Sequence, residues 1–165
     1  MRVYQIDDAT RRRFASKYQV AANGCWKWTA SQRPNGYTQF RVRQNGQWVS
    51  ALAHRVSYQL HHGSIPAGME IDHTCHDRGC VNPDHLRAVT HKQNQENQRG
   101  AHKGSRSRYR GVSFDRRRGN WVAKLSHQNK TYYLGAFPTE ELAAEAARAG
   151  RNNFLTHNLA DRKAA

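Results

Sequence analysis

The chain has 165 residues, 37% of them hydrophobic, and lysine and arginine outnumber aspartate and glutamate by 27 to 12, for a net charge of +15. The mean hydropathy is −0.98, and no apolar run approaches the ~18 residues of a membrane span, so we expect no membrane protein. An excess of positive charge this large favours a nucleic-acid partner, because phosphate contacts release condensed counterions. The alternative is a basic chain whose charge serves only solubility.

The first fifty residues predict a helix followed by β-structure. Residues 8–18 are typical of a short basic helix that carries three consecutive arginines. Asn45-Gly46 is a strong signal for a two-residue turn, because both positions tolerate a positive φ. The segments 37–42 and 47–52 on either side alternate in polarity, so we expect a β-hairpin there.

The next fifty residues predict a helix and then a strand, strand, helix unit. Residues 51–62 have apolar side chains at helical spacing,. Residues 69–73 and 86–89 are typical of short strands on either side of a cysteine-rich loop. Thr90 and Gln93 form a capping box, which predicts that a helix begins there. The order is that of a ββα unit.

After residue 98 the pattern changes. Residues 99–108 are basic and contain no apolar residue larger than alanine, which is typical of a linker,. Three short strands (110–114, 120–126 and 130–134) and an alanine-rich helix (139–149) follow. We therefore expect an α+β chain with a first domain over 1–98 that contains the ββα unit, a linker over 99–107, a three-stranded antiparallel sheet plus one helix over 108–157, and a tail over 158–165.

The three cysteines of the chain predict a metal site. Cys75, Cys80 and His85 are evenly spaced, and Cys25 lies upstream. Three thiolates and one imidazole suit a closed tetrahedral Zn²⁺ site that stabilises the fold. The alternative, cysteines buried as small hydrophobes, is disfavoured by the polar residues between Cys75 and Cys80.

A second group of residues in the same region suits phosphodiester hydrolysis. His73 is the candidate general base, because a neutral imidazole takes a proton from water near pH 7. Asp72 and Asn94 are candidate oxygen ligands for Mg²⁺ or Mn²⁺, and Arg55 is the candidate cation for the phosphate. Asn82 or a backbone carbonyl could orient the ring of His73. Each has a plainer interpretation, since Asn94 and Arg55 could be solvated helix residues.

These residues resemble the HNH endonucleases, in particular the phage HNH and His-Cys-box homing enzymes, over about residues 24–98. The matching positions are Asp72-His73, Cys75, Cys80, Asn82-Pro83, His85-Leu86 and Asn94. The resemblance implies a ββα-metal fold that cuts DNA with a histidine base and one divalent metal, leaving 5′-phosphate and 3′-hydroxyl ends. Many members have asparagine where this chain has His85, so we assign His85 to zinc.

A second resemblance covers about residues 107–155. The segments 109–113, 133–137 and 139–144 are similar to the plant ethylene-response-factor type of DNA-binding domain. That family lays a three-stranded sheet in the DNA major groove and backs it with a helix. Ser113, Asp115, Ser126 and Thr131 stand where plant domains have arginines, so the plant target sequence is not implied.

Strand alternation sorts the side chains of this sheet into two faces. The set expected to face the helix is Val112, Phe114, Trp121, Ala123, Leu125, Tyr132 and Leu134. The set expected to face DNA is Arg110, Ser113, Lys124, Ser126, Thr131 and Tyr133, with Arg116, Arg117, Arg118 and Lys130 near the phosphate backbone. The alternative is a solvated, charged sheet.

Together these patterns predict a metal-dependent endonuclease of the homing or mobile-element type that acts on double-stranded DNA. We expect a monomer or homodimer with no small-molecule substrate, inside a bacterium or phage-infected bacterium. The alternative from another class is a zinc-stabilised DNA-binding protein that does not cleave. The set Asp72, His73 and Asn94 discriminates, because a pure binder has no need of it. An RNA-binding protein is less supported, because the strands lack a ring-stacking array of aromatics.

Overall fold

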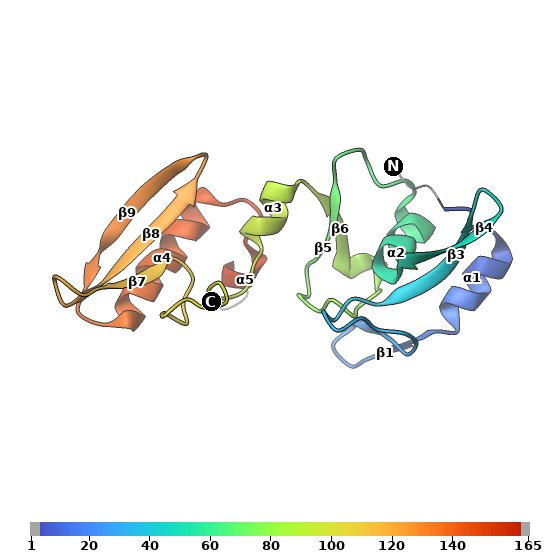
Figure 1. Ribbon diagram of the computed structural model, residues 1–165, viewed down its shortest axis with the longest axis horizontal. Helices are drawn as coiled ribbons and strands as arrows, with labels where there is room; N and C mark the ends of the chain where they lie inside the picture. The colour runs from blue at the N-terminus through green and yellow to red at the C-terminus, as the bar shows by residue number, and fades with distance from the viewer. Residues whose placement is uncertain (1–3, 163–165) are drawn as a thin grey trace. The chain divides into compact units, whose positions relative to one another are not determined.

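The computed structural model describes residues 4–162. It divides into two compact units, one ending at Asn94 and the other beginning at Gln95 (Figure 1). Both units mix helices with small antiparallel sheets, so the chain is α+β, as expected. Within residues 4–162, no helix has the length and apolar character needed to cross a membrane.

The amino-terminal unit begins with helix α1 (Asp8–Ala15), which Asp7 caps by accepting a hydrogen bond from a backbone amide of the first turn. The helix ends three residues before the expected position, because Tyr18 belongs to strand β1 (Tyr18–Val20). This strand pairs with β2 (Trp26–Trp28), and the ring of Tyr18 stacks on that of Trp26 at 4.3 Å between centroids.

The expected hairpin and the helix after it are present. Strands β3 (Gln39–Gln44) and β4 (Gln47–Leu52) pair in antiparallel register around the Asn45-Gly46 turn. Both turn residues have positive φ, 49° and 77°, which gives the right-handed twist that a two-residue hairpin needs. Helix α2 (Ala53–His62) follows without an intervening loop.

The ββα unit is also confirmed. Strands β5 (Glu70–His73) and β6 (Leu86–Val89) pair antiparallel, and helix α3 (His91–Glu96) follows. The short 3₁₀ helix η1 (Pro83–His85) leads into β6. The capping box at the start of α3 is complete, with reciprocal bonds of 2.8 and 3.2 Å between its two residues,.

Helix α2 lies between two hydrophobic clusters of the amino-terminal unit. Val56 and Leu60 belong to the larger cluster, with the apolar side chains of α1 and the β3–β4 hairpin. Tyr58, on the other side of the helix, packs against the smaller cluster of Ile65 and residues from the β5–β6 pair. The helix therefore joins the hairpin to the ββα unit.

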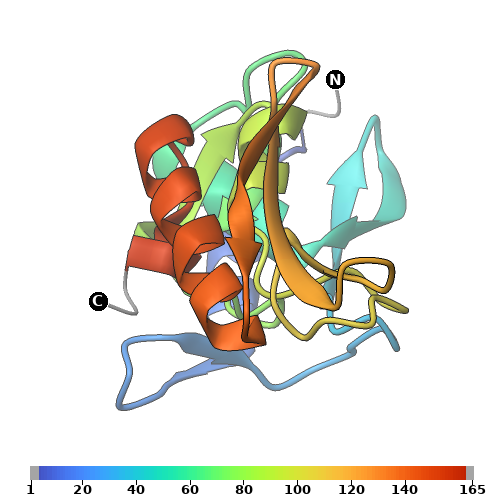
Figure 2. The same ribbon diagram turned by 90° about the vertical axis from the view of Figure 1, so that its left-hand side faces the viewer.

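The carboxy-terminal unit is a three-stranded antiparallel sheet in the order β7 (Val112–Asp115), β8 (Asn120–His127), β9 (Lys130–Phe137). Helix α4 (Glu140–Phe154) covers one face of the sheet, as Figure 2 shows. Each expected element is present, and the short helix α5 (Leu159–Arg162) is an addition that the sequence did not predict.

Small residues allow α4 to lie close to the sheet. Ala143 and Ala147 are fully buried against Val112 and Ala123. Of the side chains expected to face the helix, Phe114 is 44% exposed and packs on the ring of Trp121. This core is small, but it is continuous.

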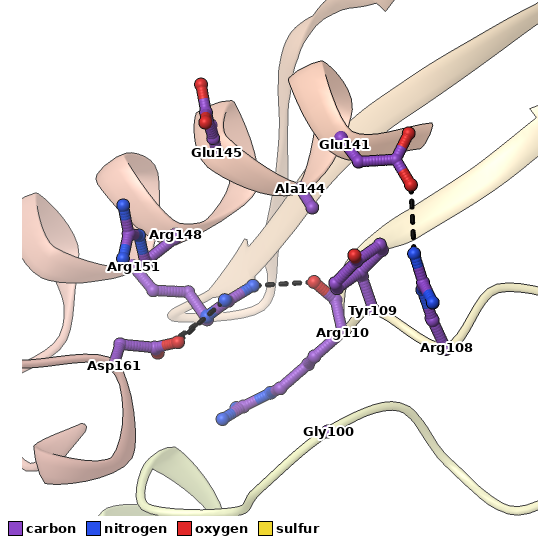
Figure 3. Close-up of a pocket in the computed structure, with 10 residues that line it drawn as sticks. All are labelled: Gly100, Arg108, Tyr109, Arg110, Glu141, Ala144, Glu145, Arg148, Arg151 and Asp161. Atoms are coloured by element: carbon purple, nitrogen blue, oxygen red, sulfur yellow. Dashed lines mark hydrogen bonds and ion pairs between the residues drawn. The ribbon is translucent and has the colours of Figure 1, made fainter. Parts of the chain in front are cut away.

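Buried Arg151 ties α4 to its neighbours, as Figure 3 shows. It donates two hydrogen bonds of 2.7 and 2.8 Å to the carboxylate of Asp161 in α5 and a third to the carbonyl of Arg110. The hollow beside it has a volume of about 370 Å³. Arg108 and Arg110 at the edge of this hollow bind other groups of the same unit. We therefore interpret the hollow as part of the packing of this unit and not as a ligand site.

Candidate functional site

Four side chains in the described part of the chain could hold one metal ion: Cys25, Cys75, Cys80 and His85. Their ligand atoms all lie within 4.8 Å of one another. The Sγ atoms of Cys25 and Cys80 are each 3.6 Å from Nδ1 of His85. A tetrahedral ion with Zn–S near 2.3 Å and Zn–N near 2.05 Å requires an S···N separation of about 3.6 Å. The donor set therefore fits zinc.

Strand β2 brings Cys25 to the other three ligands. The backbone amide of Val81 donates to the carbonyl of Trp26 at 3.0 Å. The side-chain Nδ2 of Asn82 donates to the carbonyl of Gly24 at 2.7 Å, and the side-chain Oδ1 of Asn82 accepts from the backbone amide of Asp84 and so caps η1. Asn82 therefore supports the cysteine-rich loop and does not contact the ring of His73.

The thiols of this cluster are electrostatically unequal. A hydrogen bond from Cys80 lowers the pKa of Cys75 to about 5, and the same bond raises the pKa of Cys80 above its ordinary value. Burial raises the pKa of Cys25. Three adjacent thiolates repel one another unless a cation lies between them, so this donor set suits a thiophilic dication.

His73, the last residue of β5, is held against the cysteine-rich loop. Its Nε2 lies 3.1 Å from the carbonyl oxygen of Cys80. A carbonyl only accepts hydrogen bonds, so Nε2 carries the proton and Nδ1 keeps its lone pair. Burial lowers the pKa of His73 below its ordinary value, so the imidazole is neutral at pH 7,. The sequence predicted that Asn82 or a backbone carbonyl would orient this ring, and in the structure the partner is the backbone carbonyl.

A second buried histidine lies next to His73. The ring of His54, in the first turn of α2, meets the ring of His73 edge-on at 4.8 Å between centroids. Tyr37 packs on both rings, with its centroid 5.2 Å from that of His54 and 6.2 Å from that of His73. Burial, followed by the charge of His73, holds the pKa of His54 well below its ordinary value. Sequence reasoning did not select His54, and its only signal was its place beside Arg55.

Glu70 links strand β5 to helix α3. Its carboxylate accepts a hydrogen bond of 2.6 Å from the side-chain amide of Asn94 and lies 2.8 Å from Nδ1 of His91. The bond from Asn94, followed by that from His91, lowers the pKa of Glu70. Glu70 is a second residue that sequence reasoning missed, although it precedes Asp72 by two positions and shares its strand face.

Asp72 has a different partner. Arg87, opposite it on β6, donates two hydrogen bonds of 2.9 and 2.8 Å to its Oδ2. The structure therefore pairs Asn94 with Glu70 and Asp72 with Arg87, and it does not join the two expected metal ligands directly. Arg55 is near enough for its charge to lower the pKa of Glu70. By the strand pleat, Glu70 and Asp72 share one face of β5 and His73 lies on the other.

Comparison with known proteins places these residues in a family. Residues 51–96, which include α2, the β5–β6 pair and α3, match the HNH endonuclease family. The chain is also 32% identical over 76 residues to the uncharacterized gene 5.3 protein of Enterobacteria phage T3, and the match covers 44% of this chain and 75% of that protein. The chain belongs to the HNH endonuclease family. Residues 107–157 match the AP2 domain family.

Two other phage proteins are similar to this HNH chain. Protein 2.8 of Escherichia phage T7 is 31% identical over 97 residues, which are 57% of this chain and 65% of that protein, a little under two thirds of its length. Protein 7.7 of the same phage is 35% identical over 72 residues, 44% of this chain and 52% of that protein. No solved structure gives a significant match.

The sheet of the AP2 domain exposes most of the side chains expected to face DNA. In the paired register, Lys124 lies opposite Tyr133 and Ser126 lies opposite Thr131. All four are exposed on the face away from α4, as is Ser113 on β7, and the loop residues Arg116, Arg117, Arg118 and Lys130 are also exposed.

Arg110 is the exception. It lies before β7, and its guanidinium donates to the carbonyls of Gln95, Glu96 and Gln98 at 2.9 to 3.2 Å. These carbonyls belong to the end of α3 and the residues just after it, where helical carbonyls lack intrahelical partners. The side chain is therefore engaged within its own unit, and we leave Arg110 out of the candidate DNA-binding face.

Proposed function

We propose that this protein is a divalent-metal-dependent DNA endonuclease whose HNH domain cuts double-stranded DNA while its AP2 domain holds the duplex. The observation that carries the proposal is the hydrogen bond between Nε2 of His73 and the carbonyl of Cys80. This bond presents Nδ1 of a neutral, buried imidazole as a base, and it anchors that base to the cysteine-rich loop.

In this mechanism, Nδ1 of His73 takes a proton from the water that attacks the phosphorus atom. The fixed tautomer matters, because a ring protonated at Nδ1 could not accept that proton. The edge-on ring of His54 restricts rotation of His73. His54 is in this respect a positioning residue, and it does not itself handle the proton.

Asp72 and Asn94 would hold Mg²⁺ or Mn²⁺ through side-chain oxygens. Such an ion, when bound, supplies Lewis-acid stabilisation of the scissile phosphate and of the departing 3′ oxygen. The bond from the Asn94 amide nitrogen to Glu70 turns the amide oxygen away from that carboxylate. Glu70 thus orients the ligand atom of Asn94, while Arg55 would bind a phosphate oxygen.

Zn²⁺ held by Cys25, Cys75, Cys80 and His85 would fix the loop on which the base depends. A structural zinc contributes on the order of 10 kcal/mol to folding in small metal-dependent domains. Because Cys80 is both a ligand and the hydrogen-bond partner of His73, loss of zinc would release the base as well as the loop.

We assign the products as 5′-phosphate and 3′-hydroxyl ends and the biological role as that of a homing or mobile-element nuclease in a phage-infected bacterium. Both assignments rest on the family and on its phage relatives. With one such site per chain, a monomer would nick one strand, and double-strand cleavage would require a homodimer.

In the AP2 domain we propose that the exposed sheet face enters the major groove and that the arginine loop contacts phosphates. The residues are Ser113, Lys124, Ser126, Thr131 and Tyr133, with Arg116, Arg117, Arg118 and Lys130. We further propose domain limits of 1–98 and 108–157, with 99–107 as a linker and 158–165 as a tail.

The deciding experiment is nicking of supercoiled plasmid by the full chain with Mg²⁺ or Mn²⁺, comparing the wild type with His73→Ala. Removal of the base should slow nicking by about 10²- to 10⁴-fold, with DNA binding in a gel-shift assay unchanged. The matched control is His102→Ala, which removes an exposed histidine outside the HNH domain and should nick at the wild-type rate.

The competing function is a zinc-stabilised DNA-binding protein that does not cleave. The AP2 domain and the net charge of +15 favour it as the alternative. A wild-type chain that binds duplex DNA but leaves plasmid intact with either metal would establish that alternative. Equal nicking by wild type and His73→Ala would instead reject His73 as the base.

A further inference from the structure

The outer face of the β3–β4 hairpin carries a cluster of positive charge around one indole ring. Arg41, Arg43 and Trp48 are exposed and share one face by strand alternation, and Arg43 is the direct cross-strand neighbour of Trp48,. Arg13 joins them from the end of α1. We call these four residues the arginine–tryptophan face. Trp48 is 47% exposed.

The three guanidinium groups stack on the ring of Trp48. Their central carbons lie 4.7 Å (Arg13), 5.3 Å (Arg43) and 6.0 Å (Arg41) from its centroid. Arg13 also covers the ring of Phe40 at 4.6 Å and donates to the carbonyl of Arg41. The guanidinium of Arg13 is fixed between the two rings and its Nε is buried, whereas Arg41 and Arg43 are exposed, so their N–H donors can reach a ligand,.

One carboxylate, Asp7, lies near enough to this face for the charge of Arg13 to contribute to its lowered pKa, after the hydrogen bonds from Thr10. None of the ion pairs that the structure records among residues 4–162 includes Arg13, Arg41 or Arg43. The nearby carboxylate of Asp7 caps α1 through the backbone amide of Thr10. Like charges repel one another, so a site that gathers three of them favours a polyanion.

We propose that the arginine–tryptophan face binds the phosphate backbone of the duplex that the HNH domain cuts. This proposal rests on the proposed function. Unpaired bases bind proteins mainly by stacking on free aromatic faces, and here guanidinium groups already stack on the ring of Trp48. Fixed guanidinium edges suit phosphate oxygens instead. The occupant is therefore duplex DNA and not a single strand.

The hairpin also has a fixed connection to the candidate active site. Trp48 lies in β4, four strand residues before Leu52, where α2 begins with His54 and Arg55 close behind. Four residues of strand span about 13 Å, which corresponds to about four base pairs of duplex. The arginine–tryptophan face would bind the DNA backbone a few base pairs from the scissile phosphate. It would thereby set the distance between the scissile phosphate and His73.

The test uses the full chain with Arg41→Gln and Arg43→Gln together, which removes two charges and keeps a polar side chain at each position. Binding is measured by fluorescence anisotropy on a short duplex over a range of salt concentrations, with His73→Ala in every chain to prevent cleavage. Loss of two phosphate contacts should reduce the slope of log affinity against log salt by about 1.8. The single variant Arg43→Gln should lose about half as much.

The matched control is Arg12→Gln with Lys17→Gln, which removes the same charge from α1 and the segment after it. In chains with His73 intact, the hairpin variant should raise KM for nicking and leave kcat at saturating DNA unchanged. The anisotropy readout does not require cleavage, so absence of nicking in the wild type would reject the proposed function and still leave this face testable.

Two results would overturn the proposal. One is a salt slope for the hairpin variant equal to that of the control. The other is a single-stranded probe that loses as much affinity as the duplex, which would assign the face to unpaired nucleic acid. Thermal unfolding of each variant verifies that the exposed substitutions leave the fold intact.

Discussion

The two units of this protein solve the problem of a small core in different ways. The HNH unit has two separate hydrophobic clusters and a compact Cys/His cluster beside its candidate active site. The AP2 unit has one apolar cluster, in which Ala143 and Ala147 let a helix lie directly on the sheet. In the first unit the candidate base depends on the metal cluster. In the second, the candidate DNA-binding residues lie on the opposite side of the sheet from the core.

The comparison predicts that removal of one metal ligand abolishes the HNH fold and spares the AP2 fold. Cys80→Ser should remove most of a contribution on the order of 10 kcal/mol, because Cys80 is fully buried and supplies one of the three thiolates of the cluster. Calorimetry should show loss of one unfolding transition, together with loss of bound zinc. If both transitions survive at their wild-type temperatures, the cluster does not stabilise the HNH unit.

A substitution in the core of the AP2 unit should lower the stability of that unit and leave the HNH unit unchanged. Gly111 has φ of +80°, and an added Cβ would lie 2.6 Å from the carbonyl oxygen of Lys124. We expect Gly111→Ala to destabilise this unit by about 3 kcal/mol, with zinc content unchanged. Gly119, also at positive φ but with open space around it, is the control: Gly119→Ala should cost about 1 kcal/mol. Equal losses would mean that crowding at Gly111 is unimportant.

A fall in pH should also lower the free energy of unfolding of one unit and not of the other. Burial lowers the pKa of both His54 and His73, so below about pH 6.5 the unfolded chain binds protons that the folded HNH unit does not. Its free energy of unfolding should therefore fall by up to about 1.4 kcal/mol per pH unit for each histidine. The measurement is made with zinc in excess at every pH. In His54→Leu, the free energy of unfolding of the HNH unit should show about half of the wild-type pH dependence.

The AP2 unit should be insensitive over the same range. Burial opposes ionisation of Asp161, but the hydrogen bonds and charge of Arg151 lower its pKa overall. The stability that this pair contributes is therefore present above about pH 4 and is lost only as the pH falls further. Between about pH 7 and 5.5 only the HNH transition should move, and a parallel shift of both transitions would contradict the assignment to buried histidines.

A smaller effect is expected on the exposed sheet. Lys124→Ala should weaken duplex binding several-fold and reduce the salt slope by at most about 0.9, because it removes one positive charge from the proposed groove-facing side of the sheet. The AP2 unfolding temperature should stay constant, since Lys124 is exposed on the face away from α4. Unchanged affinity, salt slope and sequence preference would show that DNA does not bind this face.

The smallest effects are expected from surface ion pairs, one in each unit. Lys27 pairs with Asp77 beside the cysteine-rich loop, and Arg108 pairs with Glu141 on the AP2 helix. Both pairs are largely solvent-exposed, so Lys27→Ala and Arg108→Ala should each change stability by less than about 1 kcal/mol. A large loss for Lys27→Ala alone would mean that the loop depends on this pair as well as on the metal cluster.

Most of the regular structure could be predicted because its signals are local. The Asn45-Gly46 turn, the capping box at Thr90 and the strand alternation of the AP2 sheet each depend on a few neighbouring residues. The end of α1 could not be predicted, because Tyr18 leaves the helix to pair with β2. Helix α5 is held by the ion pair between Asp161 and Arg151, ten residues earlier.

In the candidate site, too, the local features could be predicted from the sequence and the long-range partners could not. The spacing of Cys75, Cys80 and His85 predicted a metal site, and these side chains do lie together with Cys25; the Asp72-His73 pair predicted a nuclease, in agreement with the family. The partners of these side chains could not be read from the order of residues. Glu70 for Asn94, Arg87 for Asp72 and the carbonyl of Cys80 for His73 come from different elements.

By itself, the sequence determined which groups are available: a candidate histidine base, candidate oxygen ligands, a set of thiols and two basic domains, all encoded in residue types and short spacings. Only the tertiary structure decided which nitrogen of His73 keeps a free lone pair and which carboxylate binds Asn94. It also gathered three arginines on one tryptophan. Hydrogen-bond direction and ring stacking depend on distances between elements that are remote in the chain, and local pattern carries no record of those distances.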